Sequence, residues 1–196
     1  MPPPIVNVGY RSTNYWMLGA GPNRLLVDLG WPGTLGKMKA AWQRAGVPAG
    51  EVRYGLATHY HMDHAGLAEE LKREGMRLIV LEQQVAAIPA MRAHMKPGDH
   101  YIEITSDGNL VMAAAESRRL LAELGLSGEI VPTPGHSDDS VSLLLDDGSV
   151  FTGDLPPLGL ATEEELPAVT ASWDRLRGLG ARWIYPAHGP QRSLMA

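Results

Sequence analysis

The sequence contains no cysteine, and this absence excludes several kinds of chemistry. Disulfide bonds, thiolate metal sites, iron–sulfur clusters and a thiol nucleophile all require that residue. The sequence also lacks a Gly-x-Ser-x-Gly segment, the turn that carries the serine nucleophile of many hydrolases. A side-chain nucleophile of either kind is therefore not expected.

Long apolar runs and clusters of basic residues are also missing. No stretch approaches the roughly 18 apolar residues of a membrane span, and the N-terminal MPPPIVNVGY lacks the basic and apolar regions of a secretory signal. The net charge is -5 with scattered lysines and arginines, whereas a nucleic-acid partner usually requires a basic face. We therefore expect a cytoplasmic protein that acts on a small molecule and binds neither membranes nor nucleic acids. The sequence does not indicate an oligomeric state.

The length and composition are those of one globular domain. The 196 residues are 44% hydrophobic and 20% charged, which allows a substantial core and differs from disordered compositions. No repeat or linker divides the chain, so residues 1–196 are expected to form a single domain.

Apolar periodicity predicts alternating strands and helices. Strands are expected at residues 15–18, 24–27, 52–58, 77–81, 129–131, 141–145, 149–152 and 182–185. Helices are expected at 34–45 with Thr34 as N-cap, at 67–74, at 82–88 with a break at Pro89, around 120–124 and at 169–179. The segment 91–110 has no regular pattern. Because hairpins occur among the alternating elements, such as the GAGPN turn after residue 18, the pattern predicts a layered α/β fold with mixed sheets.

The segment His59-Tyr60-His61-Met62-Asp63-His64 holds four metal-binding side chains in six residues. At the end of an extended strand, residues two apart point the same way, so His59, His61 and Asp63 would project together. His64 would point elsewhere unless the chain turns. This spacing suits two neighbouring metal ions, and imidazole and carboxylate ligands suit zinc, iron or manganese.

Three further candidate ligands each follow a predicted strand and lie next to a glycine. His136 ends the segment TPGH, Asp154 ends TGD, and His188 lies in PAHG. Strand ends allow a rigid sheet to aim several side chains at one point. A catalytic zinc usually takes three protein ligands plus water, so these residues are candidates to complete the site.

Together these motifs resemble those of the metallo-β-lactamase superfamily. HYHMDH is similar to the family's HxHxDH signature, and TPGH, TGD and PAHG resemble its later motifs in the same order. The N-terminal segment ending in Val27-Asp28-Leu29-Gly30 also resembles the family's, so the resemblance spans nearly the whole chain. It implies a four-layer αβ/βα sandwich, with two mixed sheets face to face, helices outside and metal ions at one edge.

The resemblance also implies a cofactor of two divalent metal ions, zinc first, with iron or manganese as alternatives. It assigns His59, His61 and His136 to one ion, Asp63, His64 and His188 to the other, and Asp154 to both as a bridging ligand. A hydroxide bridging the ions would be the nucleophile, because metal coordination lowers the pKa of water from 15.7 to about 7. Asp63 would orient the hydroxide and accept a proton.

The implied reaction is hydrolysis of a small ester, thioester or related acyl substrate. The pattern is similar to the glyoxalase II-like branch without its C-terminal helical domain, because the sequence stops soon after His188. β-Lactamase activity is not expected, since β-lactamases usually lack the bridging aspartate and act after export. Phosphodiesterases and lactonases of this fold are alternatives, although Pro157 replaces the tyrosine that lactonases place three residues after that aspartate. Another alternative is a persulfide dioxygenase-like oxidoreductase with one iron on His59, His136 and Asp154.

Other residues receive structural interpretations, some with a functional alternative. Asp28 would either support a metal ligand or form a turn, and Asp138 and Asp139 fit a turn or a helix cap while remaining candidates to orient the ligand imidazoles. His94 and His100 are expected in exposed loops, with a substrate contact as the alternative. The side chains that alternate with the first ligands, Tyr60 and Met62, are expected to pack in the core.

Overall fold

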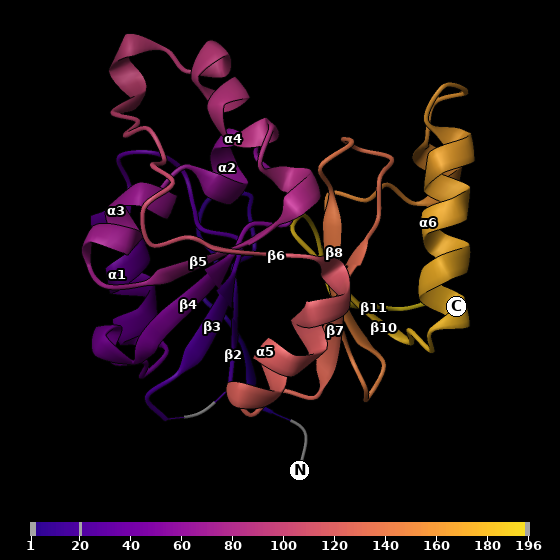
Figure 1. Cartoon of the computed structure of the whole chain (residues 1–196), viewed down its shortest axis with the longest axis horizontal. Coiled ribbons are helices and arrows are strands. Elements are labelled where there is room, and N and C mark those ends of the chain that lie inside the picture. Colours follow the sequence, from indigo (N-terminus) through magenta and orange to yellow (C-terminus); the bar gives the residue numbers. More distant parts are fainter. Residues whose placement is uncertain (1–2, 20, 195–196) are drawn as a thin grey trace.

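Two β-sheets pack face to face at the centre of the computed structural model, which describes residues 3–19 and 21–194 (Figure 1). The first sheet has the order β1 (Ile5–Asn7), β2 (Trp16–Leu18), β3 (Arg24–Val27), β4 (Val52–Leu56), β5 (Arg77–Leu81) and β6 (Leu110–Met112). The second has the order β11 (Arg192–Ser193), β10 (Trp183–Pro186), β9 (Ser149–Gly153), β8 (Val141–Leu145) and β7 (Gly128–Pro132).

Both sheets are mixed, as the sequence predicted. In the first sheet β1, β2 and β3 are antiparallel, whereas β3 to β6 run parallel. In the second, β9 and β10 are parallel and the other pairs are antiparallel. The β2–β3 hairpin is confirmed, although Ala20 in its turn lies outside the described residues.

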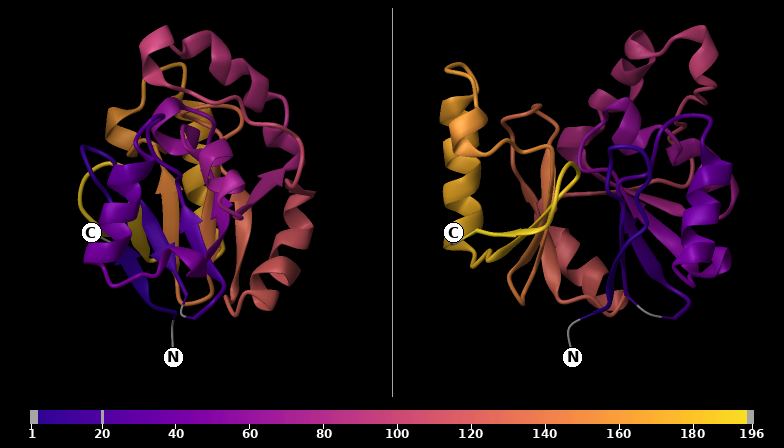
Figure 2. Two further views of the ribbon diagram at one scale, coloured as in Figure 1. Left: turned by 90° about the vertical axis from the view of Figure 1, so that its left-hand side faces the viewer. Right: turned by 180° about the vertical axis from the view of Figure 1, so that it is seen from behind.

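Helices cover the outer faces of the sheets. α1 (Leu35–Arg44) and α3 (Ala68–Arg73) lie outside the first sheet, and α6 (Leu166–Gly178) lies outside the second (Figures 1 and 2). α5 (Ser117–Glu123) packs against β7 and places Leu121 between the sheets. This arrangement confirms the expected four-layer sandwich. The shorter helices are η1 (Ala49–Glu51), α2 (Met62–Ala65), η2 (Glu82–Gln84), α4 (Ala87–Ala90), η3 (Met91–His94), η4 (Pro97–Asp99), η5 (Ala114–Glu116) and η6 (Leu158–Leu160).

The core has three layers because the central strands are buried on both faces. Successive side chains of a strand point to opposite faces, so Leu26 of β3 packs in the cluster beneath α1 and α3, while Leu25 and Val27 pack between the sheets. On the far side, Trp173 of α6 packs against Val150 of β9 in the third cluster. Fully burying one such aliphatic side chain contributes roughly 1.5–3 kcal/mol.

Two of the predicted helices differ from the observed ones near a proline. The helix predicted at 82–88 is wrong, because η2 ends at Gln84 and α4 contains Pro89 in its first turn. The last helix begins at Leu166, before its predicted start, with Pro167 in the first turn. A proline is tolerated in the first turn because its missing N–H has no partner there in any helix. Proline therefore marks helix starts at these two positions.

Residues 82–109, here called the β5–β6 segment, rise beyond the end of the first sheet (Figure 1). Short helices and irregular chain make up this segment, in agreement with the irregular pattern of residues 91–110. Thr105 anchors it to α3, since its N–H donates to Glu69 Oε2 at 3.0 Å and its carbonyl accepts from Lys72 Nζ at 2.6 Å. None of the described helices is long and apolar enough to cross a membrane.

Candidate metal centre

The seven predicted ligands lie together at one edge of the sandwich. β7, β9 and β10 run in the same direction, so the loops that carry His136, Asp154 and His188 leave the second sheet at the same edge. The HYHMDH residues follow β4 of the first sheet. Three groups have donor atoms within 4.8 Å of one another, namely His59, His61 and His136; His59, His64 and Asp154; and Asp63, His64 and His188.

The first group brings three imidazoles into direct contact. His61 Nδ1 lies 3.0 Å from His59 Nε2 and 3.1 Å from His136 Nε2. Burial lowers the pKa of His59 well below its ordinary value and also lowers that of His61. Neutral imidazoles are the form that binds metals, and a cation can accept the lone pairs of all three nitrogens. The donor set therefore fits a metal ion.

The second group combines two imidazoles with a carboxylate. Asp63 Oδ2 lies 3.4 Å from His64 Nε2 and 3.3 Å from His188 Nε2. His64 is fully buried, and its Nε2 lies within ion-pair distance of the carboxylates of Asp63 and Asp154 without a well-directed hydrogen bond to any described residue. Buried polar atoms are almost always paired, so this nitrogen also fits metal coordination.

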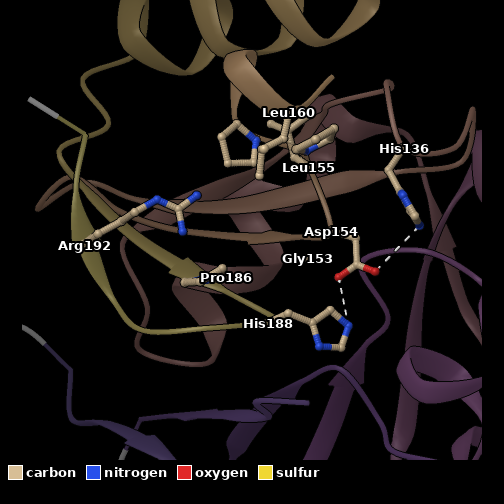
Figure 3. Close-up of a pocket in the computed structure, with 10 residues that line it drawn as sticks. His136, Gly153, Asp154, Leu155, Leu160, Pro186, His188 and Arg192 are labelled. Atoms are coloured by element: carbon tan, nitrogen blue, oxygen red, sulfur yellow. Dashed lines mark ion pairs between the residues drawn. The ribbon is translucent and has the colours of Figure 1, made fainter. Parts of the chain in front are cut away.

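Asp154 lies between the two groups (Figure 3). Its Oδ2 is 3.3 Å from His64 Nε2 and 3.6 Å from His136 Nε2, and its Oδ1 is 3.4 Å from His188 Nε2. Burial alone would raise the pKa of Asp154, but the adjacent His64 and His188 hold it below its ordinary value. An ionised carboxylate facing both groups has the position required of a bridging ligand.

Hydrogen bonds on the outer side of the centre orient the ligands. The Ser12 carbonyl lies 2.7 Å from His188 Nδ1, so it accepts the proton there and leaves Nε2 facing the centre. The Thr13 hydroxyl donates to Asp63 Oδ2 at 3.1 Å. Sequence reasoning missed both residues. Ser12 acts through its backbone carbonyl, which carries no signal in the residue type, and the Thr13 hydroxyl meets Asp63 only through tertiary structure.

Asp28 supports two ligands at once. Its Oδ1 accepts hydrogen bonds from Thr58 N–H at 2.8 Å and from the Thr58 hydroxyl at 2.9 Å, and that hydroxyl lies 3.2 Å from His59 Nδ1. Its Oδ2 lies 3.1 Å from His64 Nδ1. Burial alone would lower the pKa of His64, but Asp28 and Asp154 raise it well above the ordinary value. Asp28 also has a positive φ of 62°, so it both supports the ligands and turns the chain.

The picture of ligands projecting from an extended strand is wrong. β4 ends at Leu56, and the helical turn α2 begins at Met62, with His61 at its N-cap position. On this turn the adjacent Asp63 and His64 face the same group, which alternation along a strand would prevent. The motif thus predicted side chains that do lie together, but not their local geometry.

Close contacts between the two sheets hold the edge together. Gly153 has φ 53°, and a Cβ there would clash with the Thr58 hydroxyl oxygen, so only glycine allows β9 to end this close to the HYHMDH loop. Val141 N–H donates to the Thr58 carbonyl at 2.8 Å. Buried Gln84 donates from Nε2 to the Ala57 carbonyl at 3.1 Å. These contacts fix the start of the ligand loop against both sheets.

The remaining polar candidates lie outside the three groups. Asp139 Oδ2 accepts the Tyr60 N–H at 2.7 Å, so it holds the ligand loop rather than an imidazole. Asp138 is exposed, as is His100. Exposed His94 lines a groove of about 290 Å³ beside the centre, whose full lining is Trp31, Tyr60, His61, Met62, Asp63, Met91, His94 and Met95. Tyr60 is buried as predicted, whereas Met62 is half-buried on this groove.

A larger cavity of about 450 Å³ opens beside His136, Asp154 and His188 of the centre (Figure 3). Its polar lining consists of His136, Asp154, His188 and Arg192, and its apolar lining of Gly153, Leu155, Pro156, Pro157, Leu160 and Pro186. Small-molecule sites are mostly apolar with a few placed polar groups. The candidate metal centre is therefore flanked by two hollows that a substrate could occupy.

Comparison with known proteins identifies the family. The model of the metallo-beta-lactamase superfamily matches residues 8–188, so the chain belongs to that superfamily. A Beta-lactamase-like protein 2 homolog of Caenorhabditis elegans is 28% identical over 182 residues, which cover 92% of this chain and 57% of that protein. An atrochrysone carboxyl ACP thioesterase of Aspergillus fumigatus is 29% identical over 187 residues, which cover 91% of this chain and 51% of that protein. The chain thus spans about half the length of the curated relatives it matches.

Solved structures agree with the fold. A metallo-beta-lactamase family protein from Thermus thermophilus is 22% identical with a TM-score of 0.71, over 97% of this chain and 74% of that one. The metallo-beta-lactamase SMB-1 is 18% identical with a TM-score of 0.68, over 94% of this chain and 76% of that one. At these identities the likeness establishes the fold alone.

Proposed function

We propose that this chain is a hydrolase that uses two divalent metal ions to cleave a small ester, thioester or related acyl substrate. The observation that carries the proposal is the meeting of two three-donor groups with Asp154 facing both. A mononuclear iron site would need only His59, His136 and Asp154, and would leave Asp63, His64 and His188 without a purpose. Zinc is the metal we propose first, with iron and manganese compatible with the same donors.

The residues around the centre have separate roles in this proposal. Two bound cations would supply Lewis-acid activation of a water molecule and of the substrate carbonyl. Asp63 is the proposed catalytic residue, because its carboxylate is fixed by the Thr13 hydroxyl at 3.1 Å and can orient the water and accept its proton. Asp154 would hold both cations. Asp28 and Ser12 would keep the imidazoles of His64 and His188 turned toward the metals.

Two observations support an acyl substrate. Leu155, Pro156 and Leu160 give the larger cavity an apolar wall beside Asp154, which suits the hydrocarbon part of an acyl group. The Aspergillus fumigatus relative is named an atrochrysone carboxyl ACP thioesterase. We therefore place thioesters first within the substrate class, ahead of lactones and phosphodiesters.

The test combines metal analysis with a substrate screen. Purified protein reconstituted with zinc or manganese is expected to hold two ions per chain and to hydrolyse thioesters such as acetyl-N-acetylcysteamine. Asp154→Ala is expected to lower both the occupancy of the second ion and the turnover, while Asp138→Ala, at an exposed position, serves as the control. One iron per chain with oxygen uptake on glutathione persulfide would overturn the proposal in favour of a dioxygenase. Absence of bound transition metal after reconstitution would overturn the metal centre itself.

A further inference from the structure

Arg192 places a charged group in the wall of the larger cavity. The residue is half-buried in β11, and its guanidinium points into the cavity toward the side where Asp154 lies (Figure 3). No residue in the described ranges 3–19 and 21–194 forms a hydrogen bond or an ion pair with that guanidinium. By contrast, Arg24 pairs with Glu51 at 2.8 Å and Arg118 pairs with Asp146 at 2.9 Å. As far as the described residues are concerned, the Arg192 guanidinium is therefore available to bind a group from outside the chain.

The surroundings of Arg192 indicate the chemistry of that group. It is the one lysine or arginine among the described residues that line the cavity, where the other walls are apolar or belong to the metal centre. It also lines an adjoining hollow of about 280 Å³ together with Arg177. A guanidinium presents paired N–H donors that match a carboxylate or a phosphate. The group that complements Arg192 in this cavity is therefore an anion.

A purely structural role does not account for this side chain. β11 is held by backbone pairing with β10, in which Arg192 lies opposite Ile184, and such pairing is independent of the side chain. Arg175 makes the kind of structural contact that Arg192 makes with none of the described residues, since its Nη1 donates to the Pro132 carbonyl at 2.7 Å. Replacement of the Arg192 side chain should therefore leave the sheet intact.

We propose that Arg192 binds an anionic group, a carboxylate or a phosphate, carried by the acyl substrate away from the bond that is cleaved. The inference rests on the proposed hydrolase function and narrows its substrate class. Arg192 is then a residue that determines specificity through binding, and no bond to it is made or broken. The anion could belong to the acyl part, as in a dicarboxylic acid thioester, or to the thiol part, as in a phosphorylated carrier.

Paired substrates that differ by one anionic group test the proposal and separate the two sources. For the acyl part, succinyl-N-acetylcysteamine is compared with its succinamoyl analogue, in which an amide replaces the carboxylate. For the thiol part, acetyl phosphopantetheine is compared with acetyl pantetheine. Arg192→Gln is expected to raise KM about tenfold or more for the anionic member of one pair, with kcat and the neutral member little changed. Arg192→Lys should recover part of the loss, because it restores charge without the paired donors.

Arg119→Gln is the control, because it removes the same charge from an exposed position on α5 outside the lining of the cavity. If Arg192→Gln changes the anionic and neutral members of both pairs equally, the proposal is overturned although the hydrolase function stands. If no thioester is cleaved, NMR titration of the metal-free protein still tests whether Arg192 binds an anion. Shifts of the Arg192 side-chain N–H signal on adding succinate or phosphopantetheine, and not succinamide or pantetheine, would support the anion site, and unchanged signals would overturn it.

Discussion

Asp28 shows how much of the centre depends on a residue that is not itself a proposed ligand. One carboxylate oxygen contacts both donors of Thr58, and the other lies 3.1 Å from His64 Nδ1. The Thr58 hydroxyl also contacts His59. Asp28 therefore influences His59 in the first ligand group and His64 in the second. Orienting groups of this kind raise the basicity of a metal-bound imidazole and fix its ring.

Asp28→Asn is expected to weaken metal binding while preserving the fold. Asparagine tolerates the positive φ at this position, and its amide oxygen can still accept from Thr58. The negative charge that faces His64 is lost, so the metal affinity should fall about 10- to 100-fold. Competition with a chromogenic chelator measures the affinity, with Asp138→Asn as the control. An unchanged affinity with normal folding would reduce Asp28 to a turn residue.

At the residue scale, the sequence predicts the candidate ligands better than the residues that orient them. Metal binding needs particular side chains, so His59, His136 and Asp154 could be picked out by type and by position after a strand. The supports need only an acceptor or donor at the right point in space. The Ser12 carbonyl and buried Gln84 meet that need through tertiary structure, which residue type does not encode.

Among the helices and strands, the strands that are buried on both faces are predicted most accurately from the sequence. The ranges predicted for β3 and β5 match the observed strands because both are continuous apolar runs buried on both faces. The short edge strands β1, β6 and β11 were missed, since they have two or three residues and, unlike the equally short β2, contain none that is buried. Thr34 does occupy the N-cap position of α1, but its hydroxyl bonds to Tyr10 and the Trp31 carbonyl instead of capping the helix.

The β5–β6 segment contributes Met91, His94 and Met95 to the smaller groove, and Glu69 of α3 is a buried anchor for the part of the segment around Thr105. Glu69 is 6% exposed, accepts the Thr105 N–H and lies 3.2 Å from Lys72 Nζ. Glu69→Ala removes this charge-assisted acceptor and should lower the free energy of local opening by about 2 kcal/mol. Amide exchange in peptides covering residues 95–109 should therefore become more than tenfold faster, as measured by mass spectrometry.

Glu74→Ala is the matched control. Glu74 lies at the C-terminal end of the same helix, α3, and forms an exposed ion pair with Lys39. It is expected to leave exchange in the β5–β6 segment unchanged. If Glu69→Ala accelerates exchange equally in β3, β4 and β5, the residue stabilises the whole fold rather than the segment.

At the scale of the whole molecule, the candidate centre joins two separately built sheets. His59, His61, Asp63 and His64 follow a strand of the first sheet, while His136, Asp154 and His188 follow strands of the second. Each of the three donor groups contains residues from both sides. A cation held by any of these groups would therefore connect the sheets across the open edge of the sandwich.

Metal loading is accordingly expected to stabilise the folded chain against heat. The unfolded chain does not bring the three donor groups together, so binding favours the folded state by RT ln(1 + [M]/Kd), which is about 4 kcal/mol at a free metal concentration 1,000 times Kd. For a chain of this size, that free energy corresponds to a rise in Tm of about 10 °C. Thermal unfolding in zinc and in a chelator measures the difference, and Asp154→Ala should reduce it because this carboxylate faces both groups. The contrary result would be equal Tm values with and without metal, for protein shown to hold two ions. It would mean that the folded and unfolded chains bind the ions equally well, so the folded geometry of this edge would not determine metal binding.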